Sequence, residues 1–433
     1  MTQVLIVGAG ATGLTLAIEL LRRDIKVRII DIATEYFKGS RGKGIQPRTL
    51  ELFDAMGIAK DVIADGILYP YIKMHWGPLS IKTRSLGTHF KPSESRPFPN
   101  LIMLEQWRTE EILREKVHSL GGLIESGIGI ETLSQNKKNV TAILTTGEVL
   151  VADYVVGCDG GRSQVRKLLA LQLVGSDVDG LTSIVADIEM DDLDRNFWHA
   201  YPMFHGGMRS LAPLPFSGLF QLQAPENIAS HGLKYGIEKM TKKTVKAIHW
   251  QSQYKHQARM VEQYSLGRIF IAGDAAHIHP PSGGQGLNTG IQDAFNLGWK
   301  LVSAIKTNDP SILSTYEAER LPVAASVLNL TKKLHVTKSK LRGDQTNQLG
   351  LSYHGGPLAT TATVGEFRSG DRITDRRLKD GQRLFEVLRC GAPIQIMKAD
   401  RNHILVRPDG YIAEINQTEV SNYKGLDVIH VEG

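Results

Sequence analysis

Residues 4–31 read VLIVGAGATGLTLAIELLRRDIKVRIID, and this stretch decides the fold. The apolar runs Val4–Val7 and Val27–Ile30 have the length and composition of buried strands. Between them, apolar residues recur at helical spacing, at Leu14, Ala17, Ile18 and Leu21. A strand, a helix and a second strand in this order form a βαβ unit, which predicts an α/β fold built on a parallel sheet.

The turn before the helix, residues 8–13, has the glycine pattern of a dinucleotide-binding loop. Gly8 permits the tight turn, Gly10 lets a pyrophosphate approach the backbone, and Gly13 lets the helix pack closely. We therefore expect a dinucleotide to contact most of this loop, at Gly8, Gly10, Ala11, Thr12 and Gly13. The alternative is a glycine-rich turn that serves structure alone.

Asp31 ends the second predicted strand, where a carboxylate can accept hydrogen bonds from ribose hydroxyls. An acidic residue there favours an unphosphorylated ribose, and therefore the ADP moiety of FAD or NAD over NADP. No second glycine pattern of this kind follows another strand. If the one such loop holds a tightly bound dinucleotide, a nicotinamide cofactor would have to dock transiently.

A second informative stretch is residues 267–288, GRIFIAGDAAHIHPPSGGQGLN. A short apolar strand ends at Gly273-Asp274, a turn with two prolines follows, and glycines lead directly into a helix. The first N–H groups of a helix are unpaired, and the helix dipole adds positive charge at that end. This arrangement suits a polyhydroxylated, partly anionic ligand such as a flavin, with Asp274 accepting from hydroxyls.

The stretch YVVGCDGGRS, residues 154–163, is a further strand that ends in Asp-Gly. One interpretation places Asp159 near the dinucleotide and Arg162 and Arg166 near its phosphates or near an incoming nicotinamide nucleotide. The alternative is an ordinary turn from strand to helix in which Asp159 caps the helix.

Composition excludes several classes of protein. The chain has 433 residues with a net charge of +6 and no run of lysine and arginine, so we expect no nucleic-acid partner. Two cysteines, Cys158 and Cys390, cannot form a disulfide framework. No stretch approaches 18 consecutive apolar residues, so no membrane span is expected, and neither is a signal peptide. We expect a soluble cytoplasmic protein, as a monomer or homodimer.

Two stretches, 66–99 and 177–264, have short alternating runs, many aromatic residues and scattered proline and glycine, as antiparallel strands do. We interpret them as a sheet inserted into the α/β framework. The predicted domains are a discontinuous Rossmann-like dinucleotide-binding domain (1–70, 96–175 and 260–342), a substrate-binding β-sheet domain (71–95 and 176–259), and a C-terminal domain (343–433). Helices are expected at Arg48–Met56, at Thr109–Leu120 and from Leu287, and a strand-turn-strand at His403–Ile412.

The order and spacing of GAGATG with Asp31, CDGGRS and GDAAHIHPPSGGQGLN resemble the single-component, class A FAD-dependent aromatic monooxygenases, the p-hydroxybenzoate hydroxylase-like enzymes. The sequence is most similar to the branch of phenol and aromatic-polyketide hydroxylases, which carry a small C-terminal thioredoxin-like α/β domain. RGKGIQPRTLE, LEQWRTEEILRE and TYEAERLPVA also match, so the resemblance covers nearly the whole chain. No CxxC occurs in the C-terminal segment, so a redox role for it is not expected.

The resemblance implies FAD as the cofactor, and NADH or NADPH as a transient co-substrate. It places Arg41 and Gln106 at the pyrophosphate and ribityl parts, Asp274 at the ribityl chain, and Pro281, Gly286, Leu287 and Asn288 along the isoalloxazine ring. Gly284 is also expected to contact the cofactor. In the family, O2 adds to the reduced flavin, and a C4a-hydroperoxyflavin hydroxylates an electron-rich ring. No catalytic side chain is assigned, because the flavin carries the chemistry. No metal is expected, since the HxH of His277 and His279 lacks a third ligand.

The resemblance also implies that the substrate lies between the flavin and the inserted sheet, in contact with Trp198, Met208, Arg209, Leu211, Phe220 and Gln221. Each of these residues could instead pack in the core. We therefore expect an FAD- and NAD(P)H-dependent monooxygenase that hydroxylates a phenolic or polycyclic aromatic compound. The alternatives are another flavin enzyme on the same fold (a reductase, an oxidase or a halogenase) and a flavin-binding protein without turnover.

Overall fold

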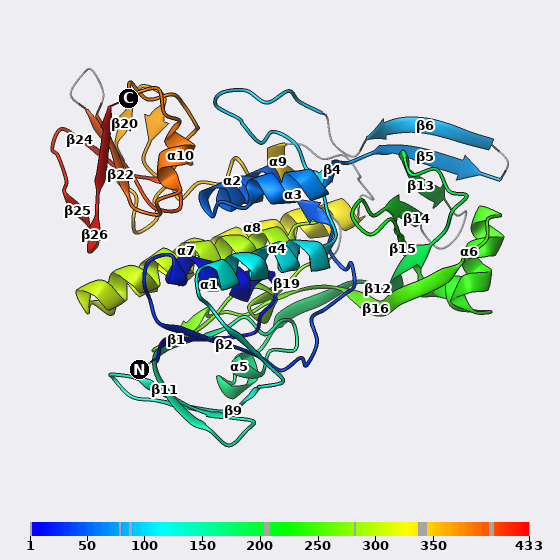
Figure 1. The fold of residues 1–433 in the computed structure, drawn as a ribbon, viewed down its shortest axis with the longest axis horizontal. Coiled ribbons are helices and arrows are strands. Elements are labelled where there is room, and N and C mark those ends of the chain that lie inside the picture. Colours follow the sequence, from blue (N-terminus) through cyan, green and yellow to red (C-terminus); the bar gives the residue numbers. More distant parts are fainter. Residues whose placement is uncertain are drawn as a thin grey trace.

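The computed structural model describes residues 2–77, 79–85, 89–202, 208–280, 283–336, 344–397 and 402–432. Figure 1 shows a parallel sheet with long helices over it, an antiparallel sheet that extends away from it, and a small C-terminal region. This arrangement confirms the predicted α/β fold with an inserted antiparallel sheet.

The parallel sheet contains the βαβ unit predicted from residues 4–31. Strand β1 (Thr2–Val7) lies between β2 (Val27–Asp31) and β11 (Val149–Gly157), and all three run parallel. Two further parallel strands, β8 (Ile124–Ser126) and β18 (Ile269–Ile271), extend the sheet on either side. Because parallel strands share one orientation, the carboxyl ends of β1, β2, β11 and β18 meet at one edge, where ligands bind in such folds. The remaining strands of this sheet are β9 (Ile130–Gln135), β10 (Val140–Leu144) and β17 (Ser265–Leu266).

Helices pack over the parallel sheet and fix that edge. Helix α1 (Ala11–Leu21) contacts α7 (Gly286–Thr307) and α4 (Gln106–Ser119), and α7 is buried along most of its length. The close packing of α1 on α7 has a local cause: a Cβ at Gly290 or Gly273 would collide with Thr12. Other helices of this layer are α2 (Pro47–Ala55), α3 (Ala59–Asp65) and α8 (Ser314–Val336). Helix α5 (Gln164–Leu168) instead contacts β9 and β11.

The second sheet has the order β19-β16-β12-β15-β14-β13-β5-β6, and within the described residues its one parallel pair is β13 with β5. Its members are β5 (Tyr71–Trp76), β6 (Leu79–Ser85), β12 (Val174–Glu189), β13 (Phe197–Pro202), β14 (Met208–Pro213), β15 (Phe220–Pro225), β16 (Ala247–Met260) and β19 (His277–Ile278). Helix α6 (Leu233–Thr241) covers one end of this sheet; the sequence analysis did not predict it. Strand β19 belongs to the loop after Asp274, so the sheet reaches the predicted flavin motif.

The C-terminal region is a small α/β unit beside the helices (Figure 1). Its sheet has the order β24-β23-β22-β27, and α10 (Leu384–Leu388) packs against it. The predicted hairpin is present as β23 (His403–Val406) and β24 (Ile412–Asn416). The other strands are β22 (Ile394–Met397) and β27 (Ile429–Glu432). The thioredoxin-like assignment of this region and the exact domain boundaries stay predictions.

The predicted helices are confirmed with small shifts in their ends. The glycines just beyond α2 and α4, Gly57 and Gly121, have positive φ of 77° and 79°, as is common where helices end. Within the described residues we find no helix whose length and hydropathy would let it cross a bilayer.

Candidate active site

The glycine loop between β1 and α1 has a geometry that requires glycine. Gly8 has φ of +106°, and a Cβ there would collide with the carbonyl of Cys158, the residue that directly follows β11. A Cβ at Gly13 would collide with the Gly8 carbonyl. At Gly10 the only atom close to such a Cβ is Glu110 Oε1, at 3.8 Å. Sterics therefore require glycine at positions 8 and 13, whereas at Gly10 there is room for a ligand to approach the backbone.

Asp31 lies beside this loop. Its Oδ2 accepts a hydrogen bond from Ala9 N at 2.6 Å, and its Oδ1 accepts one from Ala33 N at 2.8 Å. Glu110 of α4 borders the same loop and is 5% exposed, and burial raises its pKa. Glu110 was not among the site residues predicted from the sequence. The available signal was its position four residues after Gln106, which places the two on one helix face.

Gln106 connects the glycine loop to the segment that carries Arg41. Its Nε2 donates to Glu110 Oε1 at 2.9 Å, and its Oε1 accepts from Gly42 N at 3.0 Å. Arg41 is exposed, and its guanidinium lies 5.2 Å from the ring centre of Phe37 and 6.0 Å from that of Trp250. The side chain of Gln106 therefore links Glu110, beside the glycine loop, to the residue that follows Arg41.

Asp159 combines features of both interpretations of its motif. Its Oδ2 accepts from Gln164 N at 2.6 Å and Val165 N at 3.1 Å, so it caps α5. Its Oδ1 is buried, and none of the described residues hydrogen-bonds it. Arg166 donates to the carbonyls of Ala275, at 3.0 Å, and Gly161, at 2.8 Å, so its side chain holds the Asp274 loop in place.

Asp274 lies in the short turn Gly273–Ala275 that follows β18. Its side chain is accessible to solvent, yet surrounding protein raises its pKa, and the His277 and Arg41 charges oppose that rise. A Cβ at Gly286, the first residue of α7, would lie 3.9 Å from Asp274 Oδ1 and 3.8 Å from His279. The carboxylate and the helix N-terminus therefore face the same space, as the sequence predicts. Pro281 lies outside the described residues.

Asn288 joins the start of α7 to residues 44–46. Its Oδ1 accepts from Gln46 N at 2.8 Å, and its Nδ2 donates to the carbonyls of Gly44 and Gly284, both at 2.8 Å. Asn288 is fully buried, whereas Leu287 is half-buried and Gly284 is exposed. The side chain of Asn288 is thus used within the protein, which leaves the backbone groups of Gly286 and Leu287 for a ligand.

The antiparallel sheet turns a row of side chains towards this segment. Directly paired residues of neighbouring strands point to the same face. Asp187 of β12 pairs with Trp250 of β16 and with Gln221 of β15, and Gln221 pairs with Ala212 of β14. The row therefore presents an aromatic ring, a carboxylate, an amide and a small apolar side chain.

Residues 40–43 cross this row. Lys43 Nζ hydrogen-bonds Gln221 Oε1 and lies 4.6 Å above the ring of Trp198, and Gln221 Nε2 donates to the Ser40 carbonyl. Burial raises the pKa of Asp187 to about 6, although Ser40 and Lys43 favour its ionised form. Three buried atoms have no partner with hydrogen-bond geometry within the described part of the chain: Ser40 Oγ, Asp187 Oδ1 and Trp198 Nε1.

The six residues predicted to contact a substrate divide between the two faces of this sheet. Gln221 and Trp198 contact Lys43, and Met208 packs in the same apolar cluster as Trp198. Leu211 and Phe220 are fully buried in a separate cluster on the opposite face, with Leu222 and Ile188. Arg209 alternates with Met208 along β14, so it also turns to that face, and it donates to Asn227 Oδ1 at 3.1 Å. The structure therefore brings together only Trp198, Met208 and Gln221.

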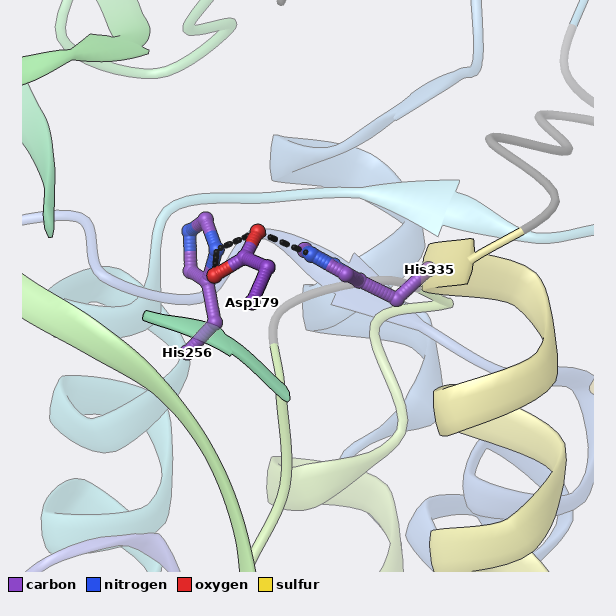
Figure 2. Close-up of side chains that lie close together, drawn as sticks. All are labelled: Asp179, His256 and His335. Atoms are coloured by element: carbon purple, nitrogen blue, oxygen red, sulfur yellow. Dashed lines mark hydrogen bonds and ion pairs between the residues drawn. The ribbon is translucent and has the colours of Figure 1, made fainter. Parts of the chain in front are cut away.

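Among the described residues, one group has donor atoms suited to a metal ion: Asp179, His256 and His335, with these atoms within 4.8 Å of one another. Figure 2 shows both imidazoles directed at the carboxylate. Asp179 Oδ2 accepts from His335 Nε2 at 2.7 Å and His256 Nδ1 at 2.9 Å, and its Oδ1 accepts from Leu181 N at 3.0 Å. Hydrogen bonds satisfy this carboxylate, so the group ties α8 to β12 and β16.

These observations fit an FAD molecule. The glycine loop leaves room at Gly10, the exposed carboxylate of Asp274 can accept from hydroxyls, and the N-terminus of α7 can stabilise an anionic ring edge. Asp159 adds a buried carboxylate oxygen that lacks a donor. Asp31 ends β2, whereas Asp159 and Asp274 follow β11 and β18. All three therefore lie at the edge where the carboxyl ends of these parallel strands meet.

Comparisons with known proteins agree with this fit. The family model for the FAD binding domain matches residues 1–331. A flavin-dependent monooxygenase of Mycobacteroides abscessus is 38% identical over 96% of this chain and 97% of the relative. The 6-methylpretetramide 4-monooxygenase of Streptomyces rimosus is 37% identical over 76% of this chain and 61% of its own. Among solved structures, the anhydrotetracycline hydroxylase OxyS of Streptomyces rimosus has a TM-score of 0.76 at 27% identity, covering 95% of both chains. The chain is therefore a member of the FAD-dependent aromatic monooxygenases.

Proposed function

We propose that this monooxygenase hydroxylates a phenolic or polycyclic aromatic compound that lies against the sheet face carrying Trp198, Met208 and Gln221. One observation carries this proposal: residues 40–46 contact both the start of α7, through Asn288, and that sheet face, through Lys43. Residues 40–46, which include Arg41 at the predicted flavin site, therefore lie between the start of α7 and the aromatic face of the sheet.

For the cofactor, we propose that the glycine loop and Asp31 hold the ADP part. Arg41, Gln106 and Asp159 then lie near the pyrophosphate and ribityl parts, and Asp274 accepts from ribityl hydroxyls. The ring lies along Pro281, Gly284, Gly286, Leu287 and Asn288. When bound, FAD supplies the chemistry by activating O2 for transfer of one oxygen atom to the substrate ring, with NADH or NADPH as the transient hydride donor.

The protein's own contribution is electrostatic and steric. The N-terminus of α7 stabilises negative charge at its end by about 0.3–2 kcal/mol. The apolar cluster of Met103, Ala200 and Ala212 with Trp198 and Met208 keeps water away from the reacting region. The buried Lys43–Gln221 contact then gives this apolar wall one polar edge, which suits a ring bearing a hydroxyl or carbonyl group.

We also propose the three-domain division given above, and that the enzyme works as a monomer or homodimer. Limited proteolysis would test the boundary near residue 343, because cleavage there should release a C-terminal fragment. Light scattering would decide the oligomeric state.

The proposal is tested by loading the purified protein with FAD and measuring NADH and NADPH oxidation with a panel of phenols and polycyclic aromatics. We expect one compound class to accelerate oxidation and to gain one oxygen atom by mass. Trp198→Ala should raise the KM for that substrate about tenfold without changing FAD affinity, since an aromatic contact contributes about 1–1.5 kcal/mol. Tyr235→Ala, which removes an exposed aromatic side chain of α6, is the matched control. Failure of every aromatic compound to accelerate oxidation would overturn the proposal.

A further inference from the structure

A chain of buried polar side chains runs beneath the Asp274 loop and is not used by the proposed function. His277 of β19 and Asp293 of α7 are both fully buried, and His277 Nε2 lies 2.6 Å from Asp293 Oδ2. Arg320 of α8 donates from Nε to Asp293 Oδ1 at 2.8 Å. At the other end, His279 Nε2 lies 2.9 Å from His277 Nδ1.

These contacts determine which ring nitrogens carry protons. The carboxylate of Asp293 can only accept, so His277 carries its proton on Nε2. In a neutral ring, His277 Nδ1 is then an acceptor, and it accepts from His279 Nε2–H. It follows that His279 Nδ1 carries a lone pair, and this buried atom has no hydrogen-bond partner among the residues that the structure describes. The chain therefore ends in a vacant proton acceptor.

The vacant acceptor belongs to the residue beside the helix start. Gly286, at the N-terminus of α7, is flanked by His279 and by Asp274 Oδ1, the two neighbours nearest to a Cβ built there. A proton taken up at His279 Nδ1 can be balanced by transfer of the His279 Nε2 proton to His277 Nδ1. The positive charge then rests on His277, against the carboxylate of Asp293. One proton enters and none is lost within the chain.

The charges around the pair indicate when this uptake is favourable. Asp293 and Arg320 offset each other, Asp274 and Arg41 lie on the ligand side, and the ring of Tyr264 lies 6.1 Å from that of His277. Burial, followed by the charge of a protonated His277, holds the pKa of His279 well below its ordinary value. The lowered pKa keeps His279 unprotonated until a new negative charge arrives close to it. Two-electron reduction of a flavin beside the start of α7 supplies such a charge.

We propose that the His277–His279 pair, held by Asp293 and Arg320, takes up one solvent proton when the bound flavin is reduced by the nicotinamide hydride. This inference rests on the proposed placement of the flavin ring at the start of α7. It makes the two histidines proton-holding residues that ease reduction, and it assigns a role to the HxH that needs no metal. Asp293 and Arg320 position the pair.

The test is the pH dependence of the flavin midpoint potential in the FAD-loaded protein. When a two-electron reduction consumes one proton, its equilibrium constant changes tenfold per pH unit. The midpoint potential then changes by about 30 mV per pH unit. Uptake of a second proton by the histidine pair doubles this slope to about 59 mV per pH unit in the weakly alkaline range. The measurement needs no substrate and no turnover.

Two variants locate the second proton. In His279→Gln the amide N–H can still donate to His277 Nδ1, but the side chain cannot be protonated, so the slope should fall to about 30 mV per pH unit. Asp293→Asn removes the carboxylate that holds the charge and should lower the slope in the same way. His249→Gln is the matched control, because His249 is exposed near the opposite end of β16 from Met260, the residue that pairs with His277.

A wild-type slope of about 30 mV per pH unit with FAD bound would overturn the inference and leave the proposed function intact. A slope of about 59 mV that persists in His279→Gln would also overturn it, because the proton would then reside elsewhere. Failure of the wild type to bind FAD would instead contradict the proposed function.

Discussion

Arg407 and Glu319 form a two-bonded ion pair that is fully enclosed by the protein. Arg407 Nη1 lies 2.6 Å from Glu319 Oε1, and Nη2 lies 2.9 Å from Oε2. The guanidinium also bonds both oxygens of Asp409, and Lys300 Nζ bonds Glu319 at 2.7 Å. Arg407 follows β23 of the C-terminal region, whereas Glu319 belongs to α8. The pair therefore joins the C-terminal region to the helices that carry the active-site loop.

Replacing Arg407 should destabilise the protein strongly. Arg407→Ala would leave Glu319 and Asp409 buried and unpaired, which costs about 3–5 kcal/mol. Chemical denaturation should show this loss in the free energy of unfolding. Arg377→Ala provides the control, because Arg377 is exposed and lies 3.9 Å from exposed Glu94, so its replacement should change stability by less than about 0.5 kcal/mol. Similar losses for both variants would contradict the structural role of the pair.

The same pair predicts sensitivity to acid. Burial alone would raise the pKa of Glu319, but Arg407 and Lys300 together lower it to about 2. A carboxylate whose folded pKa is depressed contributes stability above its unfolded pKa, which is about 4.3 for glutamate, and loses that contribution as pH falls towards 2. The contribution is roughly 3 kcal/mol. Unfolding measured from pH 7 downwards should show this loss below about pH 4.3, and Glu319→Gln should flatten the slope there.

Asp187 should make stability depend on pH in the direction opposite to Glu319. Burial raises the pKa of Asp187 to about 6, so its contribution is present below the unfolded pKa of about 3.9 and is lost as pH rises through about 6. Asp187→Asn removes the cost of the buried charge and should stabilise the protein by about 1–3 kcal/mol at neutral pH. The gain should vanish near pH 4, where the native carboxyl is neutral. Thermal unfolding at both pH values measures it, and an equal gain at both would show that charge is not the cause.

Asp274→Asn should weaken FAD binding. The carboxylate can accept two charge-assisted hydrogen bonds from hydroxyls, and each is worth about 1.5–3 kcal/mol. We expect a loss of affinity of about 10- to 100-fold, measured by fluorescence titration of the apoprotein with FAD. Asp192→Asn is the control, because Asp192 is exposed in the segment between β12 and β13, and it should leave the affinity unchanged. Unaltered affinity in Asp274→Asn would remove Asp274 from the cofactor site.

The elements built from local pattern could be predicted from the sequence. The βαβ unit of residues 4–31 and the helix from Gly286 follow from apolar periodicity and from glycines that sterics require at positions 8 and 13. Asp274 and the helix start were expected together because only a short loop separates them. Helix α6 was missed because its nine residues lie within a stretch of strand-like composition.

The substrate face could be predicted only in part, because a face depends on register. In a strand the side chains alternate between the two faces. Arg209 and Leu211 therefore turn away from residues 40–43, whereas Met208 and Ala212 turn towards them. Aromatic and polar composition alone did not distinguish these positions. The roles of Lys43 and Asp187 depend on the contact of residues 40–43 with β12 and β15. These parts are more than a hundred residues apart in the sequence, so no local pattern signals the contact.

The most direct measurement is the fate of isotopically labelled O2 during turnover with NADH or NADPH and an accepted aromatic substrate. We predict a hydroxylated product that carries one labelled oxygen atom for each nicotinamide consumed, with its formation lowered by Trp198→Ala and unchanged by Tyr235→Ala. Nicotinamide oxidation that yields only labelled hydrogen peroxide with every aromatic compound tested would contradict a monooxygenase acting at this sheet face.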